Sequence, residues 1–284
     1  MSGEINFNGD LHPQGSFYLN HKNRGLRYGD GVFETLRVIH GKSMFLEDHY
    51  LRLMASMRIL RMEIPMNFTM EFLEEEILGT LRQNSLLDKP ARVRLSVFRN
   101  DGGLYTPLTN EISYIIEVAA LDAVFYQIID GKYEVELFKD FYLNPDMLST
   151  LKTNNKILNV VGSIFAKENG YENCLLLNRD KQVAEAINGN IFLVKNRTIK
   201  TPPLKDGCLN GIIRKKIIEI VTKTEDYSLE ETSISPFELQ KADELFITNS
   251  VVGIRPITKY RKKEFERTVA SQLLGKLNAL ARLT

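Results

Sequence analysis

The stretch from Val183 to Phe192 reads VAEAINGNIF and predicts a strand, a tight turn and a second strand. Asn188-Gly189 marks the turn, because both residues tolerate the backbone conformations that tight turns require. The β-branched and aromatic residues on either side favour strands. Outward from this stretch, Cys174–Leu177 and Glu244–Thr248 have the same strand-like composition. This half of the chain therefore contains several short strands, which suggests a barrel-like or mixed sheet.

Helical patterns occur in both halves of the chain. Apolar residues at helical spacing predict helices at Glu47–Leu60 and Met70–Gln83. Further helices are predicted at about Thr153–Lys167, from Gly211 through Val221 and at Glu266–Arg282, and further strands at Ala91–Phe98, Ser113–Ala119 and Glu134–Phe138. We therefore predict an α+β fold with two domains, residues 1–120 and 129–284, joined by a linker at 121–128.

The composition is that of an ordinary globular protein. Of the 284 residues, 43% are hydrophobic and 26% are charged, and 37 basic residues nearly balance 36 acidic ones. This balance argues against nucleic acid or an anionic membrane as the main partner. No stretch approaches about 18 consecutive apolar residues, so we expect no transmembrane helix. The N-terminal residues do not resemble a secretion signal, and we expect a cytoplasmic protein whose two cysteines are reduced.

Several well-known motifs are missing from the sequence. The chain has no phosphate loop of the GxxxxGK[ST] type, no HExxH helix and no GxSxG elbow. Cys174 and Cys208 form no metal-binding cluster, and none of the four histidines is spaced as a ligand pair. We therefore expect no metal site.

Five segments carry glycine, arginine, lysine or glutamate residues that together suggest a cofactor site. In chain order they are Arg24–Thr35, Glu47–Leu53, Leu151–Lys156, Val183–Phe192, and Leu209–Arg214 taken with Thr248–Ser250. In this order they resemble the class IV aminotransferases, a family that includes branched-chain aminotransferase, D-amino acid aminotransferase and 4-amino-4-deoxychorismate lyase. The motifs are most similar to those of the lyase. The resemblance implies a smaller N-terminal α/β sandwich-like domain and a larger C-terminal barrel-like domain with helices.

The resemblance implies that the cofactor is pyridoxal 5'-phosphate and that Lys152 is the catalytic residue that binds its aldehyde. A partly desolvated lysine amine suits this chemistry, because it can be neutral and nucleophilic near neutral pH. Lys156 is the rival, but the step from Lys152 to Asn155 and the distance to Gly162 match the family. Glu185 would face the pyridine nitrogen and keep it protonated.

The remaining cofactor contacts are implied for the phosphate group and its surroundings. Arg52 would bind phosphate oxygens with its planar fork. The helix that follows Gly211 would offer free backbone N–H groups to an anion. The other residues implied to bind the cofactor are Asn190, Ile212, Ile213, Asn249 and Ser250.

The resemblance leaves the reaction open. Phe33 stands where the aminotransferases of the family often carry tyrosine and the lyases tend toward phenylalanine, and Lys156 also favours a lyase. Leu104 departs from the lyase pattern, in which that loop often carries an arginine; Arg94, Arg99 or Lys156 could bind a substrate carboxylate instead. An aminotransferase for branched-chain or D-amino acids is the alternative, and a non-catalytic protein that binds the cofactor is a third possibility. The resemblance also implies a homodimer that acts on a small amino substrate.

Overall fold

The computed structural model describes residues 3–16 and 19–283, and within them the chain forms seven α-helices and three sheets. The predicted α+β class is confirmed. The chain forms two compact units: unit 1 runs to Phe125 and also includes Lys152–Asn155, and unit 2 contains Tyr126–Leu151 and Lys156–Leu283. The sequence predicts a change of domain within 121–128, but it does not predict that Lys152–Asn155 belongs with the N-terminal part.

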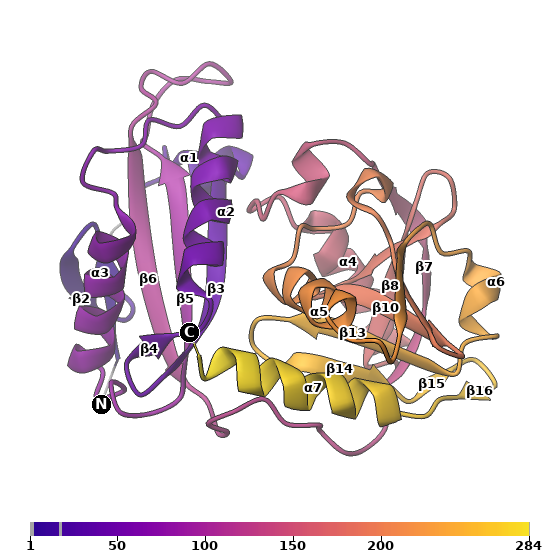
Figure 1. Cartoon of the computed structure of the whole chain (residues 1–284). Helices are drawn as coiled ribbons and strands as arrows, with labels where there is room; N and C mark the ends of the chain where they lie inside the picture. Colours follow the sequence, from indigo (N-terminus) through magenta and orange to yellow (C-terminus); the bar gives the residue numbers. More distant parts are fainter. Residues whose placement is uncertain (1–2, 17–18, 284) are drawn as a thin grey trace. The chain divides into compact units, whose positions relative to one another are not determined.

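Unit 1 is built on one antiparallel sheet of six strands in the order β2-β1-β6-β5-β3-β4. Its strands are β1 (Glu4–Phe7), β2 (Asp10–Pro13), β3 (Gly31–Ile39), β4 (Lys42–Ser43), β5 (Ala91–Arg99) and β6 (Ile112–Ala120), and its helices are α1 (Arg24–Tyr28), α2 (Leu46–Ile59) and α3 (Met70–Gln83). The apolar sides of α2 and α3 pack on one face of this sheet and form the core of the unit (Figure 1).

The two faces of β3 have different surroundings. Because side chains alternate along a strand, Val32, Leu36 and Val38 point together into the core beneath α2 and α3. Phe33 and Thr35 lie on the opposite face, where they pair with Ser96 and Arg94 of β5. The face away from the helices therefore carries Phe33 and Arg94, two of the residues that the sequence marks as candidates for substrate binding.

Unit 2 contains two five-stranded sheets, in the orders β12-β11-β10-β13-β14 and β16-β15-β7-β8-β9. The strands are β7 (Glu134–Leu143), β8 (Asn173–Asn178), β9 (Val183–Ala186), β10 (Asn190–Lys195), β11 (Thr198–Thr201), β12 (Ser228–Glu231), β13 (Glu244–Asn249), β14 (Gly253–Ile257), β15 (Lys259–Tyr260) and β16 (Lys263–Glu264). One apolar core contains residues from both sheets, as expected for a barrel-like arrangement.

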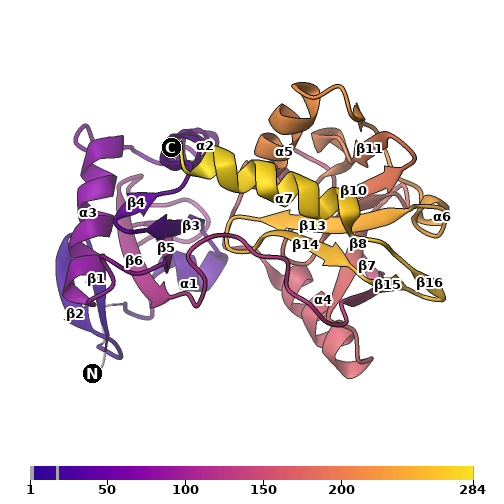
Figure 2. The ribbon, with the colours of Figure 1, turned by 60° about the horizontal axis from the view of Figure 1, so that its bottom comes forward.

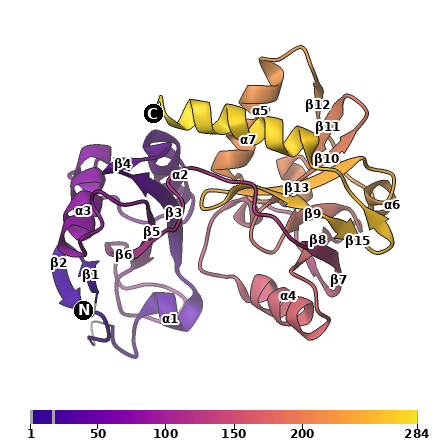
Figure 3. The same cartoon turned by 90° about the horizontal axis from the view of Figure 1, so that it is seen from below.

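The helices of unit 2 cover the outside of these sheets. They are α4 (Ile157–Glu168), α5 (Ile212–Thr222), α6 (Pro236–Leu239) and α7 (Thr268–Ala281). Figure 2 shows α7 lying across β13 and β14, and Figure 3 shows α4 on the side of the unit opposite α5 and α7. The predicted strand Val183–Ala186 is confirmed, and it leads through the Asn188-Gly189 turn into β10.

The predicted start of the helix at Thr153 is wrong, because α4 begins at Ile157. Lys152–Asn155 is instead an extended segment that pairs with the beginning of β3. The Phe33 amide donates to the Lys152 carbonyl at 2.9 Å, and the Asn154 amide donates to the Gly31 carbonyl at 2.9 Å. In a helix that began at Thr153, the Lys152 carbonyl would accept an intrahelical bond, but here it accepts the Phe33 amide instead, and the helix begins only after this pairing.

Candidate functional site

Three of the predicted residues meet on the polar face of the unit 1 sheet. The Lys152 Nζ atom lies 4.4 Å from the centre of the Phe33 ring, and the Arg94 guanidinium carbon lies 3.9 Å from the same centre. The backbone pairing between Lys152 and Phe33 holds the lysine segment against the strand that carries the ring. The structure therefore brings Lys152, Phe33 and Arg94 together.

Arg94 keeps its charge in this position. Burial lowers the pKa of Arg94, the neighbouring Glu117 opposes that change, and Arg92 adds to it. A guanidinium remains protonated in spite of such changes. Its carboxylate partner Glu117 is 3.8 Å away and half-exposed, so this ion pair is weak. A carboxylate on a substrate could therefore displace it at small cost.

Arg52 forms a buried group with Glu34 and His49. The Arg52 Nε atom donates to Oε1 of Glu34 at 2.8 Å, and Nη2 donates to Oε2 at 2.5 Å. The Nδ1 atom of His49 lies 2.7 Å from the same Oε2 atom. Burial raises the pKa of Glu34, but Arg52 and His49 outweigh burial and lower it to about 2. Burial also lowers the pKa of His49, against the opposing effect of Glu34.

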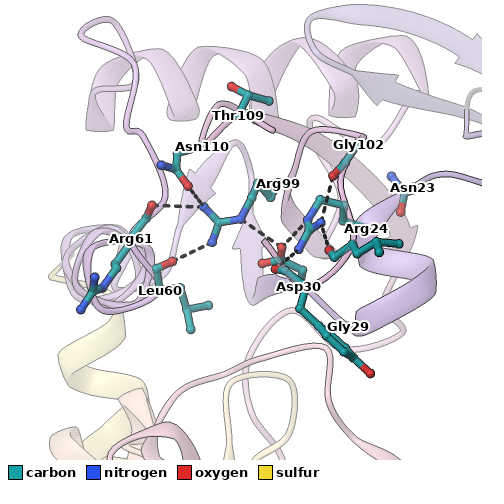
Figure 4. A network of polar contacts seen from close by, with 12 residues as sticks. Asn23, Arg24, Gly29, Asp30, Leu60, Arg61, Arg99, Gly102, Thr109 and Asn110 are labelled. Atoms are coloured by element: carbon teal, nitrogen blue, oxygen red, sulfur yellow. Dashed lines mark hydrogen bonds and ion pairs between the residues drawn. The ribbon is translucent and has the colours of Figure 1, made fainter. Parts of the chain in front are cut away.

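Arg99 lies in a different network, which Figure 4 shows. Arg99 and Arg24 both donate to the Oδ2 atom of Asp30, at 3.0 and 2.8 Å. Arg99 also donates to two backbone carbonyls and to Oδ1 of Asn110. Arg24 donates to the carbonyls of Gly102 and Leu104. The network therefore fixes the 102–105 loop. Of the two arginines on β5 that were predicted to bind substrate, Arg94 and Arg99, it is Arg94 that shares the Phe33 ring with Lys152.

Unit 2 carries Glu185, which is predicted to face the pyridine nitrogen, and the predicted phosphate ligands other than Arg52. Glu185 is buried on β9, and its Oε2 atom accepts the Leu209 amide at 2.8 Å. The side-chain amide of Asn190 donates to the Leu209 carbonyl at 2.8 Å. Glu185 and Asn190 thus hold the backbone N–H and C=O groups of Leu209, three residues before α5 starts at Ile212. The strand–turn–strand stretch identified in the sequence positions both side chains.

The N-terminus of α5 has the properties of an anion site. Gly211 is its N-cap residue, and no side chain caps the helix. A Cβ atom on Gly211 would overlap Oδ1 of Asn190, so any other residue at this position requires the Asn190 side chain to move. The backbone N–H groups at the start of this helix, including those of Ile212 and Ile213, lack intrahelical acceptors and favour an anion.

Thr248 belongs to the predicted segment Thr248–Ser250, but the sequence analysis named only Asn249 and Ser250 of this segment as cofactor contacts. It lies directly opposite Asn190 in the pairing of β10 with β13, so the two side chains share one face of the sheet. Its hydroxyl is buried and has no hydrogen-bond partner. A buried hydroxyl without a partner is unfavourable unless a ligand supplies one. The sequence already contained a signal, because Thr248 belongs to the same segment as Asn249 and Ser250.

Asn249, Ser250 and Lys156 have simpler surroundings. The side-chain oxygen of Asn249 accepts the amides of Val251 and Val252, each at 3.0 Å, and so shapes the turn after β13. The Ser250 carbonyl in this turn accepts the Tyr126 hydroxyl at 3.0 Å. Lys156 is the N-cap residue of α4 and belongs to unit 2, whereas Lys152 belongs to unit 1. Their contacts with cofactor or substrate stay predictions.

The residues of unit 2 fit a phosphorylated pyridine cofactor. The uncapped start of α5 and the unpartnered Thr248 hydroxyl suit a phosphate, and the buried Glu185 carboxylate suits a protonated ring nitrogen. Within residues 3–16 and 19–283, no group of histidine, cysteine or acidic side chains could hold a metal ion. Over the same residues, no helix is both long and apolar enough to cross a membrane.

The α+β fold, together with Glu185, Thr248 and the N-terminus of α5, is what we expect of an enzyme that uses pyridoxal phosphate. The family model for class IV amino-transferases matches residues 31–260, and the chain belongs to this family. It is 32% identical over 257 residues to a putative branched-chain-amino-acid aminotransferase of Methanocaldococcus jannaschii. The aligned residues cover 89% of this chain and 86% of that protein. The predicted family, fold and cofactor are confirmed.

Two solved structures show the same fold over almost the whole chain. One is a branched-chain amino acid aminotransferase from T.th., complexed with N-(5'-phosphopyridoxyl)-L-glutamate, with a TM-score of 0.86, 25% identity, and coverage of 100% of this chain and 95% of that one. The other is a putative 4-amino-4-deoxychorismate lyase of Legionella pneumophila, with a TM-score of 0.81, 25% identity, and coverage of 94% and 97%. The similar structures thus include both reaction types that the sequence left open.

Proposed function

We propose that this protein is a pyridoxal-phosphate-dependent lyase that converts 4-amino-4-deoxychorismate into pyruvate and p-aminobenzoate. The observation that carries the proposal is the contact of both Lys152 and Arg94 with the Phe33 ring. The Arg94 guanidinium, for which we propose a substrate carboxylate as the ligand, and the Lys152 amine, which we propose as the reactive group, lie against the same ring. Phe33 also supplies an aromatic ring without a hydroxyl, as the lyase motif does. The similarity to the Legionella lyase supports the same reaction.

Each residue has a defined part in the proposed reaction. When bound, pyridoxal phosphate supplies an aldehyde that captures the substrate amine and a pyridinium ring that accepts electrons from the adjacent carbon. Lys152 Nζ takes the proton from the substrate carbon that carries the amine. Glu185 keeps a proton on the pyridine nitrogen, and Arg94 binds a carboxylate of the substrate. Loss of the enolpyruvyl group as pyruvate makes the substrate ring aromatic. The two products, pyruvate and p-aminobenzoate, together contain all atoms of the substrate.

The phosphate would be held by groups from several elements. We assign this role to Arg52, to the N-terminus of α5 after Gly211, and to the hydroxyls of Thr248 and Ser250. Charge-assisted hydrogen bonds of this kind are commonly worth about 1.5–3 kcal/mol each. Arg52→Ala should therefore weaken cofactor binding by roughly tenfold or more. An unchanged dissociation constant would remove Arg52 from this set.

The role of Lys152 can be tested by chemical trapping. Borohydride reduction of the protein with bound cofactor should leave a pyridoxyl group on Lys152, which peptide mass spectrometry would locate. Lys156→Ala is the matched control, and it should be labelled like the wild type. Lys152→Ala should lose the label. A label on Lys156 in the wild type, with Lys152 unmodified, would contradict the assignment.

The role of Glu185 can be separated from cofactor binding. Glu185→Gln keeps the shape of the side chain but removes the charge that holds the proton on the pyridine nitrogen. Loss of one preorganised charge partner commonly reduces turnover by about 100-fold or more. We expect the variant to retain the cofactor and to turn over slowly. Turnover equal to the wild type would reject the role.

An aminotransferase is the second candidate, and the relative from Methanocaldococcus jannaschii favours it. The two reactions share the first proton transfer, but only an aminotransferase needs a 2-oxo acid. We expect p-aminobenzoate and pyruvate in equal amounts from 4-amino-4-deoxychorismate without any 2-oxo acid. Rapid turnover of branched-chain or D-amino acids with 2-oxoglutarate, without p-aminobenzoate, would establish the aminotransferase. Absence of both activities, with the cofactor bound, would favour a non-catalytic protein.

We further propose that the protein is a homodimer in the cytoplasm. Membership of the family supports the dimer, and the composition supports the compartment. Sedimentation at several protein concentrations would measure the oligomeric state directly, and a monomer at micromolar concentration would contradict the proposal.

A further inference from the structure

The buried group of Glu34, His49 and Arg52 lies beside the apolar core of unit 1. Glu34 is on the core face of β3, between Val32 and Leu36, and is 2% exposed. His49, also 2% exposed, is on α2 three residues before Arg52, so both side chains project from the same side of the helix. A buried ion pair is often no more stabilising than apolar residues of the same size. Stability alone therefore gives a weak reason for three such residues here.

The hydrogen bonds fix one edge of the Arg52 guanidinium. Glu34 engages Nε and one N–H group of Nη2, at 2.8 and 2.5 Å. The planar guanidinium has five N–H groups, so its orientation toward Glu34 also determines the direction of the opposite edge, which consists of Nη1 and the other N–H of Nη2. Arg52 is therefore oriented before any ligand arrives.

His49 fixes the Glu34 carboxylate in turn. A carboxylate oxygen can only accept, so Nδ1 of His49 carries the hydrogen in its 2.7 Å contact with Oε2. The same oxygen also accepts from Arg52, and the two donors approach it from residues of one helix. The carboxylate cannot turn without breaking at least one of these bonds. A chain of contacts thus runs from His49 through Glu34 to Arg52.

We propose that Glu34 and His49 are positioning residues that hold Arg52 in the orientation in which it binds the phosphate of the cofactor. This inference rests on the proposed role of Arg52. A free arginine side chain loses rotamer freedom when it binds, and an arginine that is already oriented loses less. Glu34 and His49 thus raise the affinity for phosphate without touching it.

The test compares pyridoxal phosphate with pyridoxal, which lacks the phosphate, as ligands of the apoprotein. Glu34→Gln offers one acceptor oxygen in place of two, so at least one donor of Arg52 or His49 would face an amide N–H. His49→Leu removes the donor, whereas His49→Asn places an amide N–H near the position of Nδ1. Glu76→Gln is the matched control, because Glu76 is a carboxylate of the same unit that accepts from Asn6 and the Tyr114 hydroxyl.

We expect Glu34→Gln and His49→Leu to weaken binding of pyridoxal phosphate by about tenfold or more while the affinity for pyridoxal stays unchanged. His49→Asn and Glu76→Gln should keep the wild-type ratio of the two affinities. Equal losses for both ligands, or an unchanged ratio in Glu34→Gln and His49→Leu, would overturn the inference. If Glu34→Gln fails to fold, the two His49 variants decide.

The experiment also separates this inference from the proposed function. Wild-type protein that binds neither ligand would overturn both. Wild-type protein that prefers pyridoxal phosphate, together with an Arg52→Ala variant that has lost the preference and a Glu34→Gln variant that has kept it, would overturn only the positioning role.

Discussion

Replacement of Gly211 by alanine tests the geometry of the proposed anion site at the N-terminus of α5. The backbone of Gly211 has φ −75° and ψ 139°, which any residue adopts, so the change introduces no backbone strain. The new Cβ atom would instead overlap Oδ1 of Asn190. Asn190 must then move and lose its 2.8 Å hydrogen bond to the Leu209 carbonyl. The perturbation therefore acts through one identifiable contact.

The magnitude follows from the burial of that contact. Asn190 is 3% exposed, and a buried polar group that loses its partner costs about 1–3 kcal/mol. We expect Gly211→Ala to lower the free energy of unfolding by that amount. The start of α5 would shift at the same time, and we expect the affinity for pyridoxal phosphate to fall by about tenfold, the equivalent of 1.4 kcal/mol. Urea unfolding and a fluorescence titration of the apoprotein would measure the two effects.

Two further variants make this test decisive. Gly275→Ala is the control, because Gly275 lies within α7 with no atom near the Cβ position. It should stabilise the protein by about 0.5–1 kcal/mol and leave the cofactor affinity unchanged. Adding Asn190→Ala to Gly211→Ala removes the clash, so the double variant should be no worse than Asn190→Ala alone. Additive losses, or wild-type affinity in Gly211→Ala, would refute the reasoning.

Three other predictions follow from charges and burial. The pKa of Glu34 lies below its usual value, so its contribution to stability is complete above about pH 4.5 and should disappear as the pH falls through about 2; Glu34→Gln should lose this pH dependence in urea unfolding. Asp30→Asn leaves the two buried guanidinium groups of Figure 4 without their shared carboxylate and should cost about 3–5 kcal/mol in the same assay. Burial raises the pKa values of Cys174 and Cys208 to about 12, so iodoacetamide should label neither thiol at pH 8 until the protein is unfolded.

Elements that local sequence determines were predicted well. The helix Met70–Gln83 and the strand Val183–Ala186 have the predicted bounds, because helical spacing and turn residues lie within each stretch. The short strands β11 and β12 were not predicted, because they have four residues each and their parallel pairing joins segments about 30 residues apart. Such pairing leaves little trace in either segment alone.

In the candidate site, too, local motifs were predicted, whereas contacts between distant segments were not. Lys152 and Glu185 were predicted from motifs, but the contacts of Lys152 with β3 were not, because about 120 residues separate the paired segments. Glu34 and His49 were missed, although the sequence held a signal. The alternation of Val32, Glu34 and Leu36 places a carboxylate on the apolar side of a strand, where it needs a buried partner.

The pairing of Lys152–Asn155 with β3 has a consequence for protein synthesis. On one side, Gly31–Phe33 pairs with β5, which lies within the first 125 residues. On the other side it pairs with the lysine segment, which is encoded some 27 codons after Phe125, so this second edge of β3 still lacks its partner when the first 125 residues have left the ribosome. A nascent chain stalled after Phe125 should therefore expose this edge, and one stalled after the lysine segment has emerged should protect it. The lysine thus reaches its place on β3 only after the sheet of unit 1 has been synthesised.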